Sequence, residues 1–122
     1  MFDAQLLMTG PSGETVSVLS PWMSRGGDHM IATLDVVATN LGSMLGEFEV
    51  EVFHKDTETT GDGVAATGTP IARDTVGRSS SEFGPLEELV RFKFTISAPS
   101  VESSFWAQFR MLSVVWFDAV TA

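Results

Sequence analysis

The feature that most constrains the fold is a strict alternation of apolar and polar residues. Residues 47–53 read Glu-Phe-Glu-Val-Glu-Val-Phe, and residues 89–97 and 30–39 alternate in the same way. Successive side chains of a β-strand point to opposite faces, whereas a helix would spread this pattern around its circumference. The alternation therefore predicts three half-buried strands. In the strand at 30–39, Leu34 and Val36 are expected on one face; the residues expected on the other are Thr33, Asp35 and Thr39.

The most apolar segment lies near the end of the sequence. Residues 105–117 read Phe-Trp-Ala-Gln-Phe-Arg-Met-Leu-Ser-Val-Val-Trp-Phe, with apolar side chains at both parities. This pattern predicts one strand that is covered on both faces, by the core of the domain on one side and by a loop or another subunit on the other. Weaker strands are expected near 2–9, 15–20 and 70–76.

Turn-forming residues separate the strands. Gly10-Pro11-Ser12-Gly13 predicts a compact turn, because proline fixes φ and glycine permits positive φ, and its flanking strands are expected to be hairpin partners. No helix is predicted beyond one short turn over 84–89, with Pro85 at its first position. About seven to eight short strands with frequent turns predict an all-β fold, an antiparallel β-sandwich or jelly roll, in a single domain spanning 1–122.

Two stretches contain few residues that could be buried. Residues 54–69 and 76–88 are rich in Gly, Ser, Thr and charged residues, and they predict long loops. Loops longer than about 12–15 residues in a compact domain tend to be functional or disordered. Each stretch is therefore expected either to contact a partner or to be a plain mobile loop.

Composition narrows the possible functions. Sixteen Asp and Glu against seven Lys and Arg give a net charge of −9, which repels phosphate backbones and anionic lipid, so neither nucleic acid nor a membrane is an expected partner. The absence of cysteine excludes disulfides, thiolate zinc sites and cysteine nucleophiles. The first eight residues lack the positively charged start of a secretory signal, which predicts synthesis in a bacterial-type cytoplasm.

No set of residues predicts an enzyme. His29 and His54 have no motif around them, and we expect both to be surface or loop residues without a catalytic role. Glu47, Glu49 and Glu51 lie about 7 Å apart at each step along a strand, near the spacing of some acid/base pairs. Alternating glutamates opposite an apolar face are ordinary sheet patterning, so no catalytic residue and no cofactor is predicted. A soluble enzyme with a site assembled in space is the third-ranked alternative.

The basic residues of the strand at 89–97 suggest a cross-strand arrangement. Arg91 and Lys93 alternate with apolar residues as the glutamates of 47–51 do. We expect this basic pair to lie across a sheet from some of these glutamates and to offset their mutual repulsion.

One loop contains candidate metal ligands. Asp56, Glu58 and Asp62 would supply the oxygen ligands that calcium prefers. Their spacing departs from that of an EF-hand loop, which needs a ligand at every second position and a glutamate at the twelfth. An ordinary surface loop is favoured, and no metal site is predicted.

Exposed aromatic residues suggest the binding alternatives. β-Sandwich domains often bind sugars through exposed aromatic rings, and Trp22, in a connection after Pro21, is the expected exposed platform. A carbohydrate-binding module is therefore the second-ranked function. Trp106, Phe109 and Trp116 are expected to divide between core and interface, which makes Trp22, Trp106, Phe109 and Trp116 the candidate partner-binding residues.

The assembled features resemble a known group of proteins. The segments Glu88-Leu89-Val90-Arg91-Phe92-Lys93-Phe94 and Phe105-Trp106-Ala107-Gln108-Phe109-Arg110-Met111-Leu112, in an acidic, cysteine-free sandwich, are similar to the small accessory proteins of tailed-bacteriophage capsids, of the decoration or cement type. The resemblance implies a non-enzymatic virion protein, made in the host cytoplasm, that binds the outer surface of the major capsid protein lattice and stabilises it. It also implies a homo-oligomer, and trimers are common among such proteins.

Overall fold

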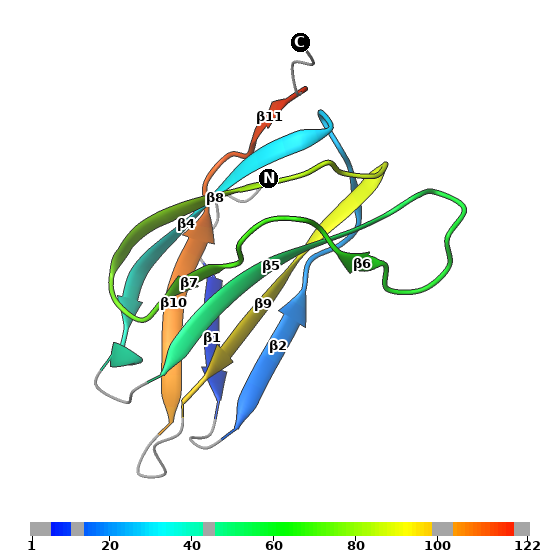
Figure 1. The fold of residues 1–122 in the computed structure, drawn as a ribbon. Coiled ribbons are helices and arrows are strands. Elements are labelled where there is room, and N and C mark those ends of the chain that lie inside the picture. The colour runs from blue at the N-terminus through cyan, green and yellow to red at the C-terminus, as the bar shows by residue number, and fades with distance from the viewer. Residues whose placement is uncertain (1–5, 11–13, 43–45, 99–103, 119–122) are drawn as a thin grey trace.

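A computed structural model describes residues 6–10, 14–42, 46–98 and 104–118 (Figure 1). The described residues form eleven strands and no α-helix, which confirms the all-β prediction. The strands are β1 (Leu6–Gly10), β2 (Thr15–Leu19), β3 (Met23–Ser24), β4 (His29–Thr39), β5 (Glu47–Lys55), β6 (Val64–Ala65), β7 (Ile71–Arg73), β8 (Gly77–Phe83), β9 (Leu89–Ser97), β10 (Phe105–Met111) and β11 (Val115–Phe117). No described segment forms a helix long and apolar enough to span a membrane.

Two antiparallel sheets form the sandwich. Sheet A has the order β1-β10-β4-β11, with β8 also paired to β4. Because β8 and β11 both pair with residues 30 and 31, they lie on opposite edges of β4, and β11 follows β10 along the same edge. Sheet B has the order β2-β9-β5-β6, with β3 in line with β2 and β7 in line with β6. The eleven strands therefore occupy eight positions, in the order of a jelly roll.

The inner faces of the two sheets meet in an aromatic core. The ring centroid of Phe109 in β10 lies 4.5 Å from that of Phe48 in β5 and 5.2 Å from that of Phe94 in β9. Burial alternates strictly along β9 and β10, as a period of two requires. The strands predicted at 30–39, 47–53 and 89–97 are confirmed, and each presents its apolar face to this core.

The prediction for the strand at 30–39 is wrong in one detail, the face on which Thr39 lies. The pairing of β10 with β4 shifts between Gln108 and Phe109, so that Val37 is an extra residue in β4. Beyond this bulge, Thr39 lies opposite the buried Ala107 instead of on the outer face with Asp35. Its hydroxyl donates to the Trp106 carbonyl oxygen at 2.8 Å, which satisfies the polar group at this position.

The expected hairpin of the first two strands is also wrong. β1 pairs with β10 in sheet A, whereas β2 pairs with β9 in sheet B, so the chain crosses between the sheets here. The crossing brings the strands very close: a Cβ on Gly10 would lie 2.6 Å from Phe105 Cζ and 2.7 Å from Val16 Cγ2. A turn-forming sequence indicates that the chain changes direction, but it does not indicate which strands then pair. Residues 11–13 of the predicted turn lie outside the described residues.

The predicted loop at 76–88 is wrong because β8 runs through it. β8 pairs with seven consecutive residues of β4, at the edge of sheet A. Because serines occupy its inner positions, β8 shows no alternation of apolar and polar residues. The serine hydroxyls form hydrogen bonds instead: Ser79 Oγ accepts from Arg73 Nη1 at 2.8 Å, and Ser81 Oγ donates to the Thr69 carbonyl oxygen at 2.6 Å. Residues 84–88 form no helical turn.

Two further boundaries differ from the prediction. The segment 105–117 is not one strand, because residues 112–114 separate β10 from β11. The loop expected at 54–69 is shorter, since β5 continues to Lys55 and β6 begins at Val64. The weaker strands are present as β1, β2 and β7, and residues 2–5 of the first lie outside the described residues.

Candidate functional site

The outer face of sheet A combines apolar side chains with charged side chains of both signs. It is defined here by the outward-pointing residues Ile31, Thr33, Asp35, Val37, Arg78, Ser80, Glu82, Trp106, Gln108, Arg110 and Val115. Three of these are exposed large hydrophobic residues: Ile31 and Val37 are each 37% exposed and Val115 is 57% exposed. Alternating strand positions thus place apolar groups in contact with water on this face.

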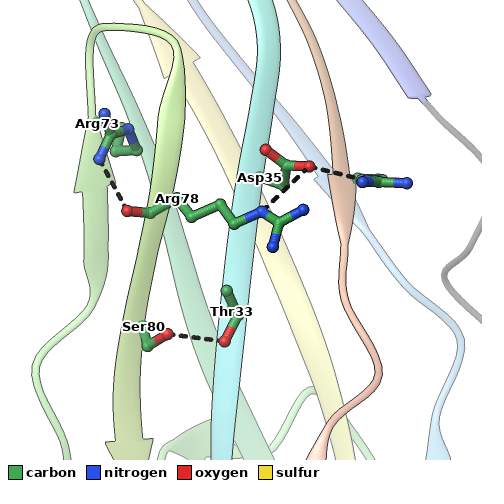
Figure 2. Close-up of polar contacts among 6 residues, drawn as sticks. Thr33, Asp35, Arg73, Arg78 and Ser80 are labelled. Atoms are coloured by element: carbon green, nitrogen blue, oxygen red, sulfur yellow. Dashed lines mark hydrogen bonds and ion pairs between the residues drawn. The ribbon is translucent and has the colours of Figure 1, made fainter.

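Two arginines neutralise the single carboxylate at the centre of this face. Arg110 Nε in β10 donates to Asp35 Oδ2 at 2.8 Å, and Arg78 Nε in β8 lies 3.7 Å from the same oxygen (Figure 2). The Asp35 side chain is only 13% exposed, whereas that of Arg78 is 60% exposed. The group of three carries a net charge of +1 in a chain of net charge −9.

Sequence reasoning did not find this group. Asp35 and Arg110 are 75 residues apart, and alternation assigns each to an outer face without stating which strands are neighbours. The same cross-strand contact recurs one step along the sheet, where Thr33 Oγ1 and Ser80 Oγ lie 2.7 Å apart (Figure 2). The pairing of β8, β4 and β10 is the information that the sequence pattern lacks.

The three candidate residues of the last strands lie in different environments. Phe109 is 1% exposed and belongs to the core, so a partner cannot reach it. Trp116 points inward and packs against the edge of the core, where a Cβ on Gly26 would lie 2.6 Å from its ring. Trp106 is half-buried on the outer face of sheet A, opposite Thr9 of β1. Trp106 is thus the one of the three that presents its ring on that face.

The outer face of sheet B is acidic along β5. Glu47, Glu49 and Glu51 follow one another, and Lys93 lies directly opposite Glu51. Partial burial, followed by the charges of Glu51 and Glu47, raises the pKa of Glu49, and Lys93 opposes that rise. The predicted cross-strand pairing is therefore confirmed for Lys93. For Arg91 it is wrong, because Arg91 lies opposite Phe53 and pairs with Asp62 of the loop instead.

Trp22 is covered by two cations. Lys55 Nζ lies 4.6 Å and Arg91 Cζ 4.3 Å from the centroid of its ring. Both cations also hold the loop 56–63: Lys55 Nζ donates to the Gly61 carbonyl oxygen at 3.0 Å, and Arg91 Nη2 lies 3.1 Å from Asp62 Oδ1. Trp22 is half-buried in this cluster and is not the open platform expected for a sugar ring.

The two histidines make structural contacts. His29 Nδ1 lies 2.8 Å from Asp28 Oδ1, and its ring stacks on Phe117 with centroids 5.4 Å apart. His54 Nδ1 accepts a hydrogen bond from the Glu87 backbone N–H at 3.0 Å. The His29 ring therefore contacts two neighbouring side chains, and the His54 ring binds the backbone at Glu87.

The two aspartates of the loop 56–63 have partners within the protein: Asp62 pairs with Arg91, and Asp56 bonds within the loop. Asp56 Oδ1 accepts hydrogen bonds from the Thr59 hydroxyl at 2.5 Å, the Thr59 N–H at 2.6 Å and the Glu58 N–H at 3.1 Å. These bonds, that of the hydroxyl first, lower the pKa of Asp56. Within the described residues, no three His, Asp or Glu side chains form a group that could hold a metal ion.

The structure also has an open depression of about 350 Å³. It is lined by Gly46, Glu47, Ala72, Arg73 and Asp74. Small-molecule sites are mostly walled by hydrophobic and aromatic side chains, and this depression has only Ala72 as an apolar side chain.

Comparisons with known proteins gave no match: no protein-family model, no curated protein and no solved structure is significantly similar to this chain.

Proposed function

We propose that the protein is a non-enzymatic structural protein of a virion, a decoration protein that binds the outer surface of a major capsid protein lattice. The observation that carries the proposal is the difference between the two faces of the sandwich. The outer face of sheet A presents exposed apolar residues, Trp106 and equal numbers of arginines and carboxylates, while that of sheet B presents a row of three glutamates opposed by Lys93. A protein that coats a surface needs one face to attach and another to remain solvated.

The outer face of sheet A has the composition of an attachment surface. Aromatic residues and arginine are enriched at protein interfaces, and tryptophan and arginine are common among the residues that dominate binding. Burial of a lone carboxylate would be costly, but Asp35 already has two arginine partners. Desolvation of this face therefore leaves no unpaired carboxylate at its centre.

The charge distribution favours the outside of the capsid. Packaged DNA repels a chain of net charge −9, so a position on the inner surface would be unfavourable. The glutamates of β5 would then face solvent on the decorated particle. The protein would stabilise the lattice by mass action, because a ligand that binds only the assembled lattice shifts the equilibrium toward it. We also propose that it acts as a homo-oligomer.

The first experiment is to measure association with particles. Virions from the producing host should contain this chain at a fixed ratio to the major capsid protein, measured by quantitative mass spectrometry across a density gradient. Particles stripped of the chain should rebind it. The variant Ile31→Lys places a charge on the outer face of sheet A and should reduce occupancy at least tenfold. Val64→Lys is a matched control at an exposed valine of β6 and should bind like wild type.

Two results would overturn the proposal. The chain could be absent from particles, or Ile31→Lys could bind as wild type does. A monomer that binds a glycan on an array with micromolar affinity would instead support the carbohydrate-binding alternative. For that alternative the sugar would have to bind a half-buried Trp22 ring that already has Lys55 Nζ 4.6 Å and Arg91 Cζ 4.3 Å from its centroid.

A further inference from the structure

The edge of sheet B at β2 is a second surface, distinct from the outer face of sheet A. Among the described residues β2 pairs only with β9, and Figure 1 shows it as the outermost strand on that side. The Ser20 N–H donates to the Phe92 carbonyl oxygen at 2.9 Å, which fixes the phase of the hydrogen bonds along the pair. In an antiparallel pair this phase alternates, so the backbone groups of Val16 and Val18 also point toward β9. Those of the alternate residues, Thr15, Ser17 and Leu19, point away from the sheet.

The open edge carries no charged side chain and has two exposed apolar ones. Val18 is 47% exposed and Leu19 is 46% exposed. No charged residue occurs between Glu14 and Arg25, nor within β1, the neighbouring edge strand of sheet A. Proteins usually protect exposed sheet edges with charged side chains or proline. The opposite side of the sandwich has such protection in Arg78 and Glu82 of β8, whereas β2 has none within the strand.

We propose that β2 pairs with β2 of a second copy of this chain, antiparallel and about a two-fold axis at Ser17. In this register Ser17 opposes Ser17 of the second copy, and Thr15 opposes Leu19. These residues direct their backbone groups toward the partner, so the pairing supplies about six backbone hydrogen bonds. The two copies of sheet B would become one continuous sheet.

The strand is complementary to itself, which favours a second copy over another partner. Val16 of each copy opposes Val18 of the other copy. Each exposed Val18 side chain is therefore covered by a valine of the second copy. Each Glu14 would oppose Ser20 of the other copy. The two Glu14 residues would then be about 20 Å apart along the strands. That separation exceeds the screening length of about 8 Å at physiological salt, so the two Glu14 carboxylates repel each other only weakly across the contact.

The first test is the mass of the purified chain in solution, measured by light scattering and sedimentation equilibrium. Wild type should have twice the chain mass of 13.2 kDa. Val18→Lys brings two like charges together at the axis and should weaken dimerisation at least 100-fold. Val76→Lys makes the same substitution at another exposed valine, 59% exposed, and should leave the dimer unchanged.

The second test is hydrogen exchange of individual amides. In the wild-type dimer the amides of Ser17 and Leu19 should exchange slowly, and in Val18→Lys they should exchange fast. The Val16 amide bonds to β9 and should stay protected in both, which also shows that the variant is folded. A second variant, Ser17→Pro, removes an N–H that points out of the sheet and should likewise give a monomer.

Three outcomes would overturn the inference: a wild-type monomer or trimer, a dimer that persists in both variants, or a dimer in which the Ser17 and Leu19 amides exchange fast. All are measured without particles. The dimer can therefore fail while capsid binding succeeds, or the reverse.

Discussion

Replacing Phe109 by alanine should weaken the core that joins the two sheets. The side chain is 1% exposed and contacts the rings of Phe48 and Phe94. Truncation of a buried phenylalanine to alanine costs about 3–5 kcal/mol, and each lost aromatic pair accounts for about 0.5–1.5 kcal/mol. The free energy of unfolding of a domain is about 5–15 kcal/mol, so this variant should lose a large part of it. Phe109→Leu keeps most of the volume but loses both ring contacts, so it should cost about 1–3 kcal/mol, less than the alanine variant.

Urea unfolding, followed by tryptophan fluorescence, measures this effect. With a denaturant slope of about 2 kcal/mol per molar, Phe109→Ala should lower the midpoint by about 2 M. Trp106→Ala, at a half-buried site on the outer face, should lower it by less than half as much. The reverse order would refute the reasoning. A one-residue slip of β10 would move Trp106 into the core and Phe109 to the surface, and the two variants would then exchange their effects.

Three further substitutions test local features. Because the pKa of Glu49 is raised, the folded protein holds that proton more tightly than the unfolded chain, and ionisation costs stability as pH rises. Glu49→Gln should therefore raise the melting temperature at pH 7 and leave it unchanged at pH 3; the gain is roughly a few tenths of a kcal/mol, since Glu49 lies on the outer face, where solvent screens its charge. The lowered pKa of Asp56 has the opposite sign: its stabilisation is present above the unfolded pKa and is lost as pH falls through the folded pKa. Asp56→Asn should thus melt earlier than wild type at pH 7 and together with it at pH 2, and equal melting at pH 7 would contradict this. Gly10→Ala places a Cβ 2.6 Å from Phe105 Cζ and should cost about 1–2 kcal/mol in chemical denaturation; a neutral result would mean that the two strands approach less closely.

The parts of the fold that depend on side-chain period were predictable. The residues of β5 and β9 alternate so regularly that strand, length and buried face all follow from the sequence. β8 was not predictable in this way, because Ser79 and Ser81 occupy its inner positions. Such a strand is stabilised by backbone pairing and by hydrogen bonds to Arg73 and Thr69. Neither interaction produces a pattern of apolar residues in the sequence.

The candidate site depends on pairings that a local pattern does not contain. Asp35 meets Arg78 and Arg110 only because β4 lies between β8 and β10. Trp22 was expected in the open because proline and polar residues surround it in sequence. Cations from β5 and β9 cover its ring instead, and such contacts between distant segments require the three-dimensional arrangement.

The order of strands in sheet A determines when the protein can fold during its synthesis. β10 lies between β1 and β4, so β1 has no strand neighbour, and β4 lacks its partner on that edge, until residue 111 has been synthesised. At about 5–20 residues per second, the wait of β4 for that partner is roughly 4 to 14 s. The apolar side of β4, with Met30, Leu34 and Val36, packs in the core that Phe105, Phe109 and Met111 of β10 complete. Sheet A can therefore be completed only when almost all of the described sequence is available.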